Sequence, residues 1–519
     1  MGHWTGMDRR NFLKGLGAMP AAALTVGQTP ASEAPARRAP QPDARQRTSK
    51  PGDGKKLVGI QIGGRSFVDE GVEKCLDTLQ EKGAVNWLLP TVFTYGRGLA
   101  GRQVPGRPLP DHGGQAYDDI HGGSYTRVHP QFYAGSVINP TDIRAPELGD
   151  FDILADVTPR ARARGMRVSL LFEEVYNPRL IPHFEQIAEV DVYGRPGRST
   201  CLNNPHARTF IVSMVEDWFK SNELDGLMWE SERQGPLNNM LGANFSGVGD
   251  RTTANCFCTY CTHKGKEQGI DVARAKEGYV ALEQWVKRTL HDARTAGSDG
   301  AFVTLWRLLV QYPEILAWHK QWFLSQEEVY ALIYGTVKAI NADAQVGWHI
   351  MQYVTLSPFY KADQDYSRIV HYADYLKPCP YNNAGGPRLA TYIKNVHSTI
   401  FRDLTPEQVL DLHYKWLGLT NEATLDKLPT AGLSAEYVAR ETARAKALVK
   451  DVVPIYPGID IDIPTDLKDK QTTPADVKAA TIAAFKAGAA GVVLSRKYAE
   501  MKLTNIAGAG AAIRELGLA

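Results

Sequence analysis

The sequence lacks three features that would each point to a different class of protein. Beyond the N-terminus there is no run of about 20 apolar residues, so we expect no membrane span in the mature chain. The formal net charge is only +2, without the basic surplus typical of nucleic-acid-binding proteins, so no nucleic-acid partner is expected. The residues after the first predicted strand, Gly63-Gly64-Arg65, lack the spacing of a dinucleotide-binding turn. We expect no organic cofactor.

Cysteine is also scarce, with six residues in 519, although a chain of this length can bury a large core without disulfides. Cys256, Cys258 and Cys261 lie so close together that their thiolates can surround one Zn²⁺ from a single loop. We expect Cys201 to be the fourth ligand, with His263 as the second choice. Four thiolates would make this zinc structural. Disulfide bonding in an oxidising compartment and free thiols are the alternatives.

The N-terminus has the features of an export signal. Arg9-Arg10-Asn11-Phe12-Leu13-Lys14 precedes a short apolar stretch rich in Ala and Gly, the order found in twin-arginine signals. We assign residues 1–34 to this signal peptide, with cleavage near Ala23 or Ala34. Residues 35–55 are rich in Pro, Ala, Arg and Gln and are predicted to form a disordered linker. The mature protein is therefore expected in the periplasm or outside the cell.

Residues 56–519 alternate between short apolar runs and amphipathic helical stretches, a pattern typical of parallel βαβ units. Eight such units predict an α/β protein with a (β/α)8 TIM barrel. An open doubly wound sheet is the main alternative. The eight predicted strands are 57–62, 86–93, 167–172, 226–229, 345–349, 375–379, 453–457 and 491–495.

Long insertions interrupt the predicted barrel. The segments 94–148 and 231–344 follow the second and fourth strands, and residues 401–433 form a further excursion. Loops that follow the strands of a barrel build its active site. We therefore searched for reactive side chains where each predicted strand ends.

Acidic residues follow three of the predicted strands. Glu174 follows the third, Glu230 and Glu232 follow the fourth, and Asp460 and Asp462 follow the seventh. Cleavage of a glycosidic bond needs two carboxyl groups, one to protonate the leaving oxygen and one to attack the sugar or activate water. Glu230 and Glu232 would face the same side of an extended chain. We expect Glu232 to be the proton donor, with Glu230 as the next choice, and Asp460 or Glu174 to supply the partner carboxylate.

Several other side chains near the strand ends are expected to bind substrate. Arg233 is also expected to hold one of the two glutamates ionised. Flat aromatic rings suit the CH face of a sugar, although ordinary core packing is the alternative for each ring. Arg496 with Lys497 would suit a carboxylate or sulfate on an acidic sugar, unless the pair is merely solvated. The expected substrate-binding residues are Trp229, Arg233, His349, Lys377, Tyr381, Tyr456 and Arg496.

These motifs together resemble the zinc-bearing barrel β-galactosidases and a group of uncharacterised hypothetical glycosyl hydrolases. The resemblance spans roughly residues 56 to 500 and lies in the Cys-x-Cys-x-x-Cys loop with its upstream cysteine, in residues 125–130 and 163–168, and in Trp229-Glu230-Ser231-Glu232-Arg233-Gln234-Gly235-Pro236. It implies a (β/α)8 fold, a proton-donor glutamate at Glu230 or Glu232, and a nucleophile after the seventh strand. The chain departs from that pattern, because Asp460 and Asp462 stand where those enzymes have a glutamate, and no asparagine precedes the donor.

The sequence therefore predicts an exported glycoside hydrolase that acts on an oligo- or polysaccharide through two carboxylates. One alternative is a non-catalytic carbohydrate-binding barrel. Another is a different barrel enzyme, such as a metal-dependent hydrolase or isomerase, although Gln61-Ile62-Gly63 at the first strand lacks the His-x-His pair of many such hydrolases. A carbohydrate is the expected partner, and no oligomeric state is predicted.

Overall fold

The computed structural model describes residues 56–94, 111–112, 122–138, 143–174, 184–245, 254–291 and 299–518. The chain divides into two units, Met1–Asp53 and Gly54–Ala519, and every described residue belongs to the second. The predicted signal (1–34) and linker (35–55) lie outside the described residues. Within the described ranges, no helix has the length and apolar character needed to cross a membrane.

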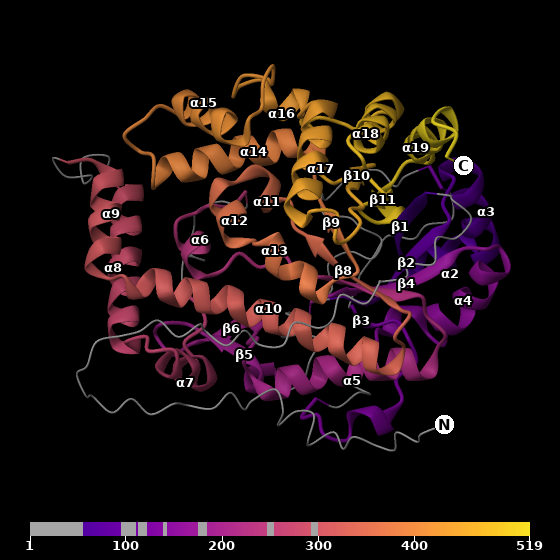
Figure 1. Cartoon of the computed structure of the whole chain (residues 1–519), viewed down its shortest axis with the longest axis horizontal. Helices are drawn as coiled ribbons and strands as arrows, with labels where there is room; N and C mark the ends of the chain where they lie inside the picture. Colours follow the sequence, from indigo (N-terminus) through magenta and orange to yellow (C-terminus); the bar gives the residue numbers. More distant parts are fainter. Residues whose placement is uncertain are drawn as a thin grey trace, which may run out of the picture. The chain divides into compact units, whose positions relative to one another are not determined.

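Eight parallel strands form a nearly closed barrel, which confirms the predicted fold class (Figure 1). The ring closes where the amide of Leu376 donates to the Pro454 carbonyl at 3.1 Å and the amide of Tyr456 donates to the Leu376 carbonyl at 2.9 Å. Around the ring the strands are β10 (Gly458–Asp460), β11 (Gly491–Ser495), β1 (Leu57–Gly63), β2 (Trp87–Thr94), β4 (Arg167–Glu173), β7 (Gly226–Glu230), β8 (Gln345–Ile350) and β9 (Tyr375–Pro378).

The seventh strand of the barrel begins later than predicted. The segment 453–457 contributes only an isolated bridge between Ile455 and Leu376, and the regular strand β10 starts at Gly458. Pro454 and Pro457 have no backbone N–H and so cannot extend the hydrogen-bonded ladder through this segment. As a result Asp460 is the last residue of the strand instead of lying in the loop behind it.

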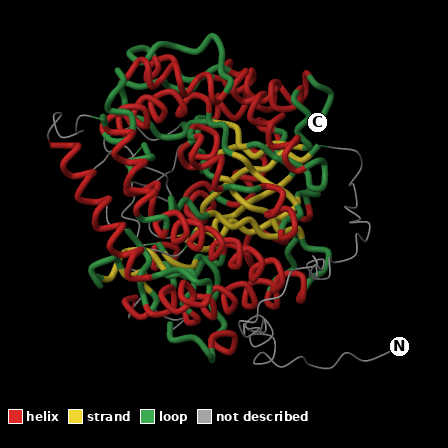
Figure 2. The backbone as a smooth tube through the Cα atoms, turned by 60° about the vertical axis from the view of Figure 1, so that its left-hand side comes forward, coloured by secondary structure: helices red, strands yellow, loops and turns green. Residues whose placement is uncertain are grey.

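Helices surround the strands, as the red and yellow tubes of Figure 2 show. The helix α4 illustrates the local signals: the Asp152 side chain accepts hydrogen bonds from two amides of its first turn, and Gly165 leaves the helix with φ of 73°. The longer helices that link successive strands are α3 (Val72–Gly83), α4 (Ile153–Ala163), α5 (Pro205–Ser221), α10 (Glu314–Ile340), α14 (Asn382–Ser398), α17 (Ala435–Val449) and α18 (Pro474–Lys486), and α19 (Leu503–Glu515) follows the last strand.

Further short strands and helices lie between the barrel strands, some of them in the predicted insertions. A short strand β3 (Gly123–Ser124) pairs antiparallel with β2, and a hairpin of β5 (Ala188–Val190) and β6 (Pro196–Thr200), which was not predicted, precedes α5. The remaining helices are α2 (Gly64–Glu70), α6 (Pro236–Met240), α7 (Thr259–Glu267), α8 (Val272–His291), α9 (Ala301–Gln311), α11 (Tyr353–Leu356), α12 (Pro358–Asp363), α13 (Tyr366–Ile369), α15 (Pro406–Leu417) and α16 (Leu428–Ala431).

The barrel interior changes from apolar to polar along the strands. Side chains alternate between the two faces of a strand, so a residue two positions after an inward one also faces inward. The apolar inner layer consists of Trp87, Leu89, Leu171, Met228, Tyr375, Tyr456 and Val493. Two positions beyond four of these members, toward the carboxyl ends of the strands, come Glu173, Glu230, Lys377 and Ser495. The sequence thus places a polar layer on the side of the barrel where active sites form.

Candidate active site

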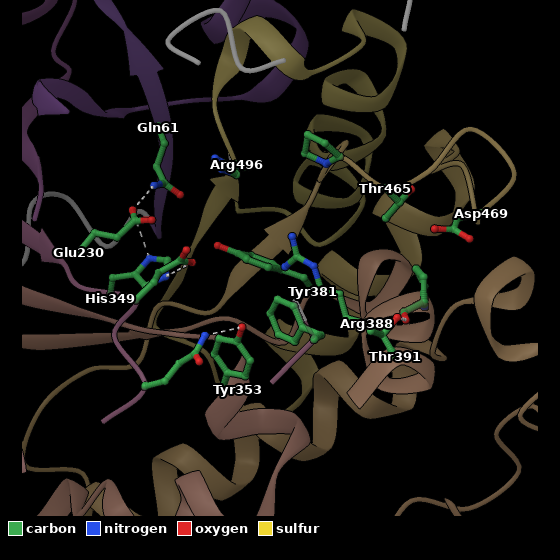
Figure 3. Close-up of a pocket in the computed structure, with 15 residues that line it drawn as sticks. Gln61, Glu230, His349, Tyr353, Tyr381, Arg388, Thr391, Thr465, Asp469 and Arg496 are labelled. Carbon is green, nitrogen blue, oxygen red and sulfur yellow. Dashed lines mark hydrogen bonds and ion pairs between the residues drawn. The ribbon is translucent and has the colours of Figure 1, made fainter. Parts of the chain in front are cut away.

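A cavity of about 440 Å³ lies at the carboxyl ends of the strands (Figure 3). Its volume falls within the range of about 300–1,000 Å³ that is usual for small-ligand sites. Figure 3 shows Glu230 and His349 at one side of the cavity, Thr465 and Asp469 at the other, and Tyr381 between them. The lining residues are Gln61, Glu230, Glu232, Gln234, Phe245, His349, Tyr353, Tyr381, Pro387, Arg388, Thr391, Pro464, Thr465, Asp469 and Arg496.

Two glutamates and one histidine form the centre of this site. Glu230 ends β7 and lies in register with His349 on β8. The Nδ1 atom of His349 is 3.5 Å from Glu230 Oε2, and its Nε2 atom is 3.7 Å from Glu232 Oε1. One ligating atom from each of the three residues lies within 4.8 Å of the others. The ring of His349 therefore faces both carboxylates.

Neighbouring polar groups fix the orientation of Gln61 beside Glu230. The Gln61 Oε1 atom accepts hydrogen bonds from Ser495 Oγ at 2.9 Å and Lys377 Nζ at 3.2 Å. Its Nε2 atom is consequently turned toward Glu230 Oε2, to which it donates at 3.3 Å. Lys377 also donates to the Tyr381 hydroxyl at 2.6 Å. Lys377, predicted to contact substrate, is fully buried and acts here through Gln61 and Tyr381.

The charges around His349 favour its protonated form, although Lys377 opposes that form. Burial alone lowers the pKa of His349, but the negative charges of Cys379 and Glu230 outweigh burial and raise it to about 10. Cys379 is also buried, and its Sγ atom lies 3.4 Å from His349 Nε2. Burial raises the pKa of Cys379, but the positive charges of His349 and Lys377 lower it by more.

Two arginines complete the charged lining of the cavity. Arg388, on α14, donates from Nη1 to Gln352 Oε1 at 2.6 Å and lies over the Phe245 ring at 5.0 Å. Phe245 in turn stacks on Tyr353, with ring centroids 4.0 Å apart. Arg496 follows β11, and its Nη1 atom is 3.7 Å from Glu500 Oε1. The cavity thus combines acidic, basic and aromatic groups.

Arg233 does not hold Glu230 or Glu232, so that expectation is wrong. Its guanidinium binds Glu174 Oε1 at 2.7 Å from Nη1, and Nη2 pairs with Glu189 on β5. All of these side chains are buried. Sequence reasoning missed this arrangement because Glu189 comes from the unpredicted hairpin. Glu174, expected as a partner carboxylate, is occupied by an ion pair outside the cavity lining.

Asp460 and Asp462 are committed to backbone and side-chain donors. Asp460 accepts hydrogen bonds from the amides of Ala384 at 2.8 Å and Ile463 at 3.0 Å, and burial raises its pKa. Asp462 accepts from the Lys502 amide at 2.7 Å and from Asn505 at 2.9 Å. Neither is among the lining residues of the cavity. β10 therefore brings no carboxylate into this site.

The cavity contains some of the expected residues and adds others. Glu230, Glu232, His349, Tyr381 and Arg496 line it, whereas Trp229 packs against Tyr330 and Trp348 and Tyr456 lies in the apolar inner layer. Strand alternation offered a signal for Gln61, which faces inward near the end of β1. Other lining residues come from loops and α14, where no periodic pattern marked them: Gln234, Phe245, Arg388, Thr391, Thr465 and Asp469.

The four predicted zinc ligands come together in one cluster. Cys201 follows β6, Cys256 and Cys258 precede α7, and Cys261 lies on it. The Sγ atom of Cys201 is 3.4 Å from that of Cys258 and 3.5 Å from that of Cys261, and the four sulfurs lie within 4.8 Å of one another. The second choice, His263, instead has an exposed side chain that pairs with Glu267 at 3.2 Å.

The sulfur separations fit a metal better than a disulfide. A disulfide requires about 2.05 Å between sulfurs. A tetrahedral Zn²⁺ with bonds of about 2.3 Å sets its sulfurs about 3.8 Å apart, close to the separations found here. The amides of Val190 and Asn203 donate to Cys256 and Cys261 at 3.3 Å each, the type of contact that supports metal-bound thiolates. The cluster can hold a metal ion.

Comparison with known proteins identifies the export signal. Residues 6–26 match the family of the TAT (twin-arginine translocation) pathway signal sequence, as predicted. No curated protein matches the chain. Matching structures include α-L-fucosidase isoenzyme 2 from Paenibacillus thiaminolyticus, at 12% identity and a TM-score of 0.46, covering 89% of this chain and 49% of the fucosidase.

Two further structures show the same kind of likeness. The β-galactosidase of the Antarctic haloarchaeon Halorubrum lacusprofundi is 13% identical with a TM-score of 0.49, covering 89% of this chain and 58% of that one. The PgaB (BpsB) glycoside hydrolase domain from Bordetella bronchiseptica is 12% identical with a TM-score of 0.42, covering 85% of this chain and 94% of that one. The chain thus spans about half the length of the fucosidase it matches. At such identities the chain is similar to these glycoside hydrolases in its barrel fold alone.

Proposed function

We propose that this protein is an exported glycoside hydrolase in which Glu230 and Glu232 cleave the glycosidic bond. The observation that carries the proposal is the convergence of both carboxylates on one cavity, at 3.5 and 3.7 Å from the two nitrogens of His349. Two carboxyl groups are the minimum equipment for this chemistry. The cavity occupies the end of the barrel where its loops place catalytic groups.

The surroundings of the two glutamates suggest different roles. Glu230 has a side chain only 9% exposed and accepts a hydrogen bond from Gln61, an arrangement suited to an ionised nucleophile. The side chain of Glu232 is 34% exposed and can reach a departing oxygen. We therefore assign Glu232 as the general acid. Its carboxyl proton passes to the glycosidic oxygen while a Glu230 oxygen attacks the anomeric carbon and the alcohol departs.

The second half of the reaction reverses these roles. Water loses a proton to Glu232, attacks the anomeric carbon and breaks the ester to Glu230, which releases the sugar and restores both side chains. Retaining enzymes have carboxyl groups about 5–5.5 Å apart, and inverting ones about 6.5–9.5 Å. One oxygen from each glutamate here lies within 4.8 Å of the other, which leaves little room for a water molecule between the carboxyl groups and supports retention as the proposed outcome.

Other lining groups support saccharide binding in the same cavity. Tyr353, Tyr381 and Phe245 offer aromatic surface for the CH face of a sugar ring. The charged ring of His349 lies between the two carboxylates and can stabilise the ionised one at each stage. It is a positioning residue in this mechanism. The twin-arginine signal supports delivery to the periplasm or beyond, where saccharide polymers are accessible.

We further propose that Cys201, Cys256, Cys258 and Cys261 hold a structural Zn²⁺. Four thiolates leave no open coordination position, which excludes a role for this ion in the reaction. The metal would tie the end of hairpin β5–β6 to the start of α7. That hairpin also supplies Glu189 to Arg233, so the zinc would stabilise the segment next to the site.

Activity measurements on the signal-free chain test the proposed function. The purified protein is assayed on a panel of aryl glycosides and polysaccharides, beside Glu230→Gln and Glu232→Gln. Each substitution should lower kcat by about 10²–10⁴, the usual contribution of a general acid or base. Glu267→Gln, an exposed glutamate on α7, is the matched control and should behave as the parent. Cleavage that survives both site substitutions would overturn the assignment, and binding without any cleavage would indicate a carbohydrate-binding barrel.

One observation favours a second candidate, a metal-dependent barrel enzyme. Glu230, Glu232 and His349 together form a set that can ligate a divalent cation. The Nζ atom of Lys377 lies 3.2 Å from His349 Nδ1, however, and a cation so close opposes a metal there. Brief EDTA treatment, followed by zinc analysis so that the ion of the cysteine cluster is shown to stay bound, separates the two. The glycosidase keeps its rate under these conditions, whereas a metal-dependent enzyme loses it and regains it with Mn²⁺ or Mg²⁺.

A further inference from the structure

Two arginines face the proposed active site without a close carboxylate partner. Arg388 donates to the neutral amide of Gln352 at 2.6 Å, and among the described residues it forms no ion pair. The side chain of Arg496 is 13% exposed, and its ion-pair partner, Glu500, is 3.7 Å away. Both arginines line the cavity that holds Glu230 and Glu232. Their remaining N–H groups are available to a ligand.

Two other buried cations near the site, Lys497 and Arg233, each have a short ion pair with a glutamate. Lys497, adjacent in sequence to Arg496, binds Glu173 at 2.6 Å, and Arg233 binds Glu174 at 2.7 Å. A buried charge is costly unless an opposite charge accompanies it, which explains these short pairs. Arg388 has no ion pair among the described residues, and Arg496 has only the longer contact with Glu500 at 3.7 Å. Burial lowers the pKa of Arg496, but the charges of nearby glutamates, Glu500 and Glu232 above all, raise it by more. In contrast to Arg233 and Lys497, these two arginines keep N–H groups that no short ion pair occupies, so a further anion can bind them.

The two guanidinium groups are also near enough to affect each other. Burial lowers the pKa of Arg388, Glu232 opposes this effect, and the positive charge of Arg496 lowers the pKa further. When Glu232 carries the proton required of the general acid, it no longer offsets these charges. An anionic group between the arginines would relieve the repulsion.

Arginine is well suited to such a ligand. The planar guanidinium matches the oxygen geometry of carboxylates and sulfates and can bind them through two parallel hydrogen bonds. Arg388 is held in place by Gln352 and by the Phe245 ring at 5.0 Å, so little side-chain freedom is lost on binding. Lys497, which the sequence grouped with Arg496, is instead held by Glu173 at 2.6 Å and is not among the residues that line the cavity.

We propose that Arg388 and Arg496 together bind the carboxylate or sulfate of an acidic saccharide, so that the substrates are uronic-acid-containing or sulfated glycans. This inference rests on the proposed function in that the saccharide occupies the cavity of Glu230 and Glu232. It adds the substrate class and two specificity-determining residues on α14 and behind β11.

Calorimetric titration of a non-cleaving variant tests this inference. Glu232→Gln is titrated with a uronic-acid oligosaccharide, a sulfated oligosaccharide and neutral counterparts of each, prepared by carboxyl reduction and by desulfation. At least one acidic ligand should bind about tenfold or more tightly than its neutral counterpart, and added NaCl should weaken that preference. The two acidic ligands distinguish a carboxylate from a sulfate. In the Glu232→Gln background, a second substitution, Arg388→Gln or Arg496→Gln, should abolish the preference for the acidic ligand. Arg388→Lys and Arg496→Lys, which keep the positive charge, should retain part of that preference.

Arg307→Gln serves as the matched control, because Arg307 is exposed on α9 and pairs with Asp299 at 2.7 Å. Equal affinity for acidic and neutral ligands, binding of neither, or a preference that persists without both arginines would overturn the inference. The proposed function fails separately: selective binding of an acidic glycan that the enzyme with intact Glu230 and Glu232 does not cleave would support the anion site and contradict glycoside hydrolysis.

Discussion

Arg233 binds Glu174 with 2.7 Å between Nη1 and Oε1, and the two residues come from the ends of neighbouring strands β7 and β4. The same guanidinium pairs with Glu189 and lies over the Trp322 ring at 5.1 Å. All of the charged groups are buried. This network joins the barrel to hairpin β5–β6 and α10, so we regard Arg233 and Glu174 as structural.

Glu174→Gln should destabilise the protein because it leaves Arg233 with one buried counter-charge in place of two. Removing one member of a buried ion pair typically costs about 3–5 kcal/mol. Chemical denaturation of the parent and variant measures the loss. Glu223→Gln is the control, since Glu223 is 90% exposed and its pair with Arg162 is a surface contact worth at most about 1 kcal/mol. A Glu174→Gln variant as stable as the control would contradict the structural role.

Zinc analysis tests the cysteine cluster. The purified protein should contain one zinc ion per chain by plasma mass spectrometry, and Cys258→Ser should lose the metal and unfold at a lower temperature. The reason is that three remaining thiolates bind Zn²⁺ less tightly than four. Cys75→Ser is the matched control, because Cys75 is a buried cysteine outside the cluster whose thiol donates to the Ser66 carbonyl at 3.4 Å. Metal-free protein with free thiols or disulfides would rule out the zinc site.

Asp462 makes a specific contribution to the pH dependence of stability. Burial raises its pKa from 3.8 to about 6 in the folded state. Between these values the folded protein holds a proton that the unfolded chain has released, so this residue's contribution is present below pH 4 and is lost as the pH rises through 6. Asp462→Asn cannot ionise. Its stability relative to the parent should therefore improve from pH 4 to pH 8, by an amount on the order of 3 kcal/mol.

Thermal unfolding at pH 4.5 and pH 7.5 measures this difference. The side-chain carbonyl introduced by Asp462→Asn can still accept from the Lys502 amide and from Asn505, so the comparison isolates the charge. Asp299→Asn, an exposed substitution, should follow the parent at both pH values. A melting-temperature difference between Asp462→Asn and the parent that does not change with pH would contradict the assignment.

Much of the fold could be predicted because the spacing of apolar residues along the chain indicates most of its strands and helices. Seven barrel strands lie within one or two residues of the predicted ranges, since continuous apolar runs mark strands buried on both faces. β10 begins later than predicted because Pro454 and Pro457 have no backbone N–H to donate, and a hydrophobicity pattern does not reveal this loss. The hairpin β5–β6 was missed because its strands are short and charged, as in Ala188–Val190, and carry no apolar alternation.

The candidate site was predictable only where it lies on strands. Alternation along β7 and β8 brings Glu230 and His349 to the cavity, and both were expected there. The pairing of Arg233 with Glu174 and Glu189, in contrast, depends on how segments distant in sequence meet, which no local pattern encodes. Arg388 lies on α14, where the spacing of apolar residues predicts which face is packed but not which polar side chain reaches the cavity. The sequence therefore indicated the reactive carboxylates better than the groups that would select the substrate.

The most direct test of the account is to trap the sugar on the enzyme. The signal-free protein is incubated with a 2-deoxy-2-fluoro aryl glycoside of the sugar that it cleaves, and intact and peptide mass spectrometry locate the added mass. The account predicts one sugar per chain, attached to Glu230, and no label in Glu230→Gln. A label on Asp460, Asp469 or another carboxylate, or none on an enzyme that turns over the parent glycoside, would contradict the assignment of Glu230 as the nucleophile.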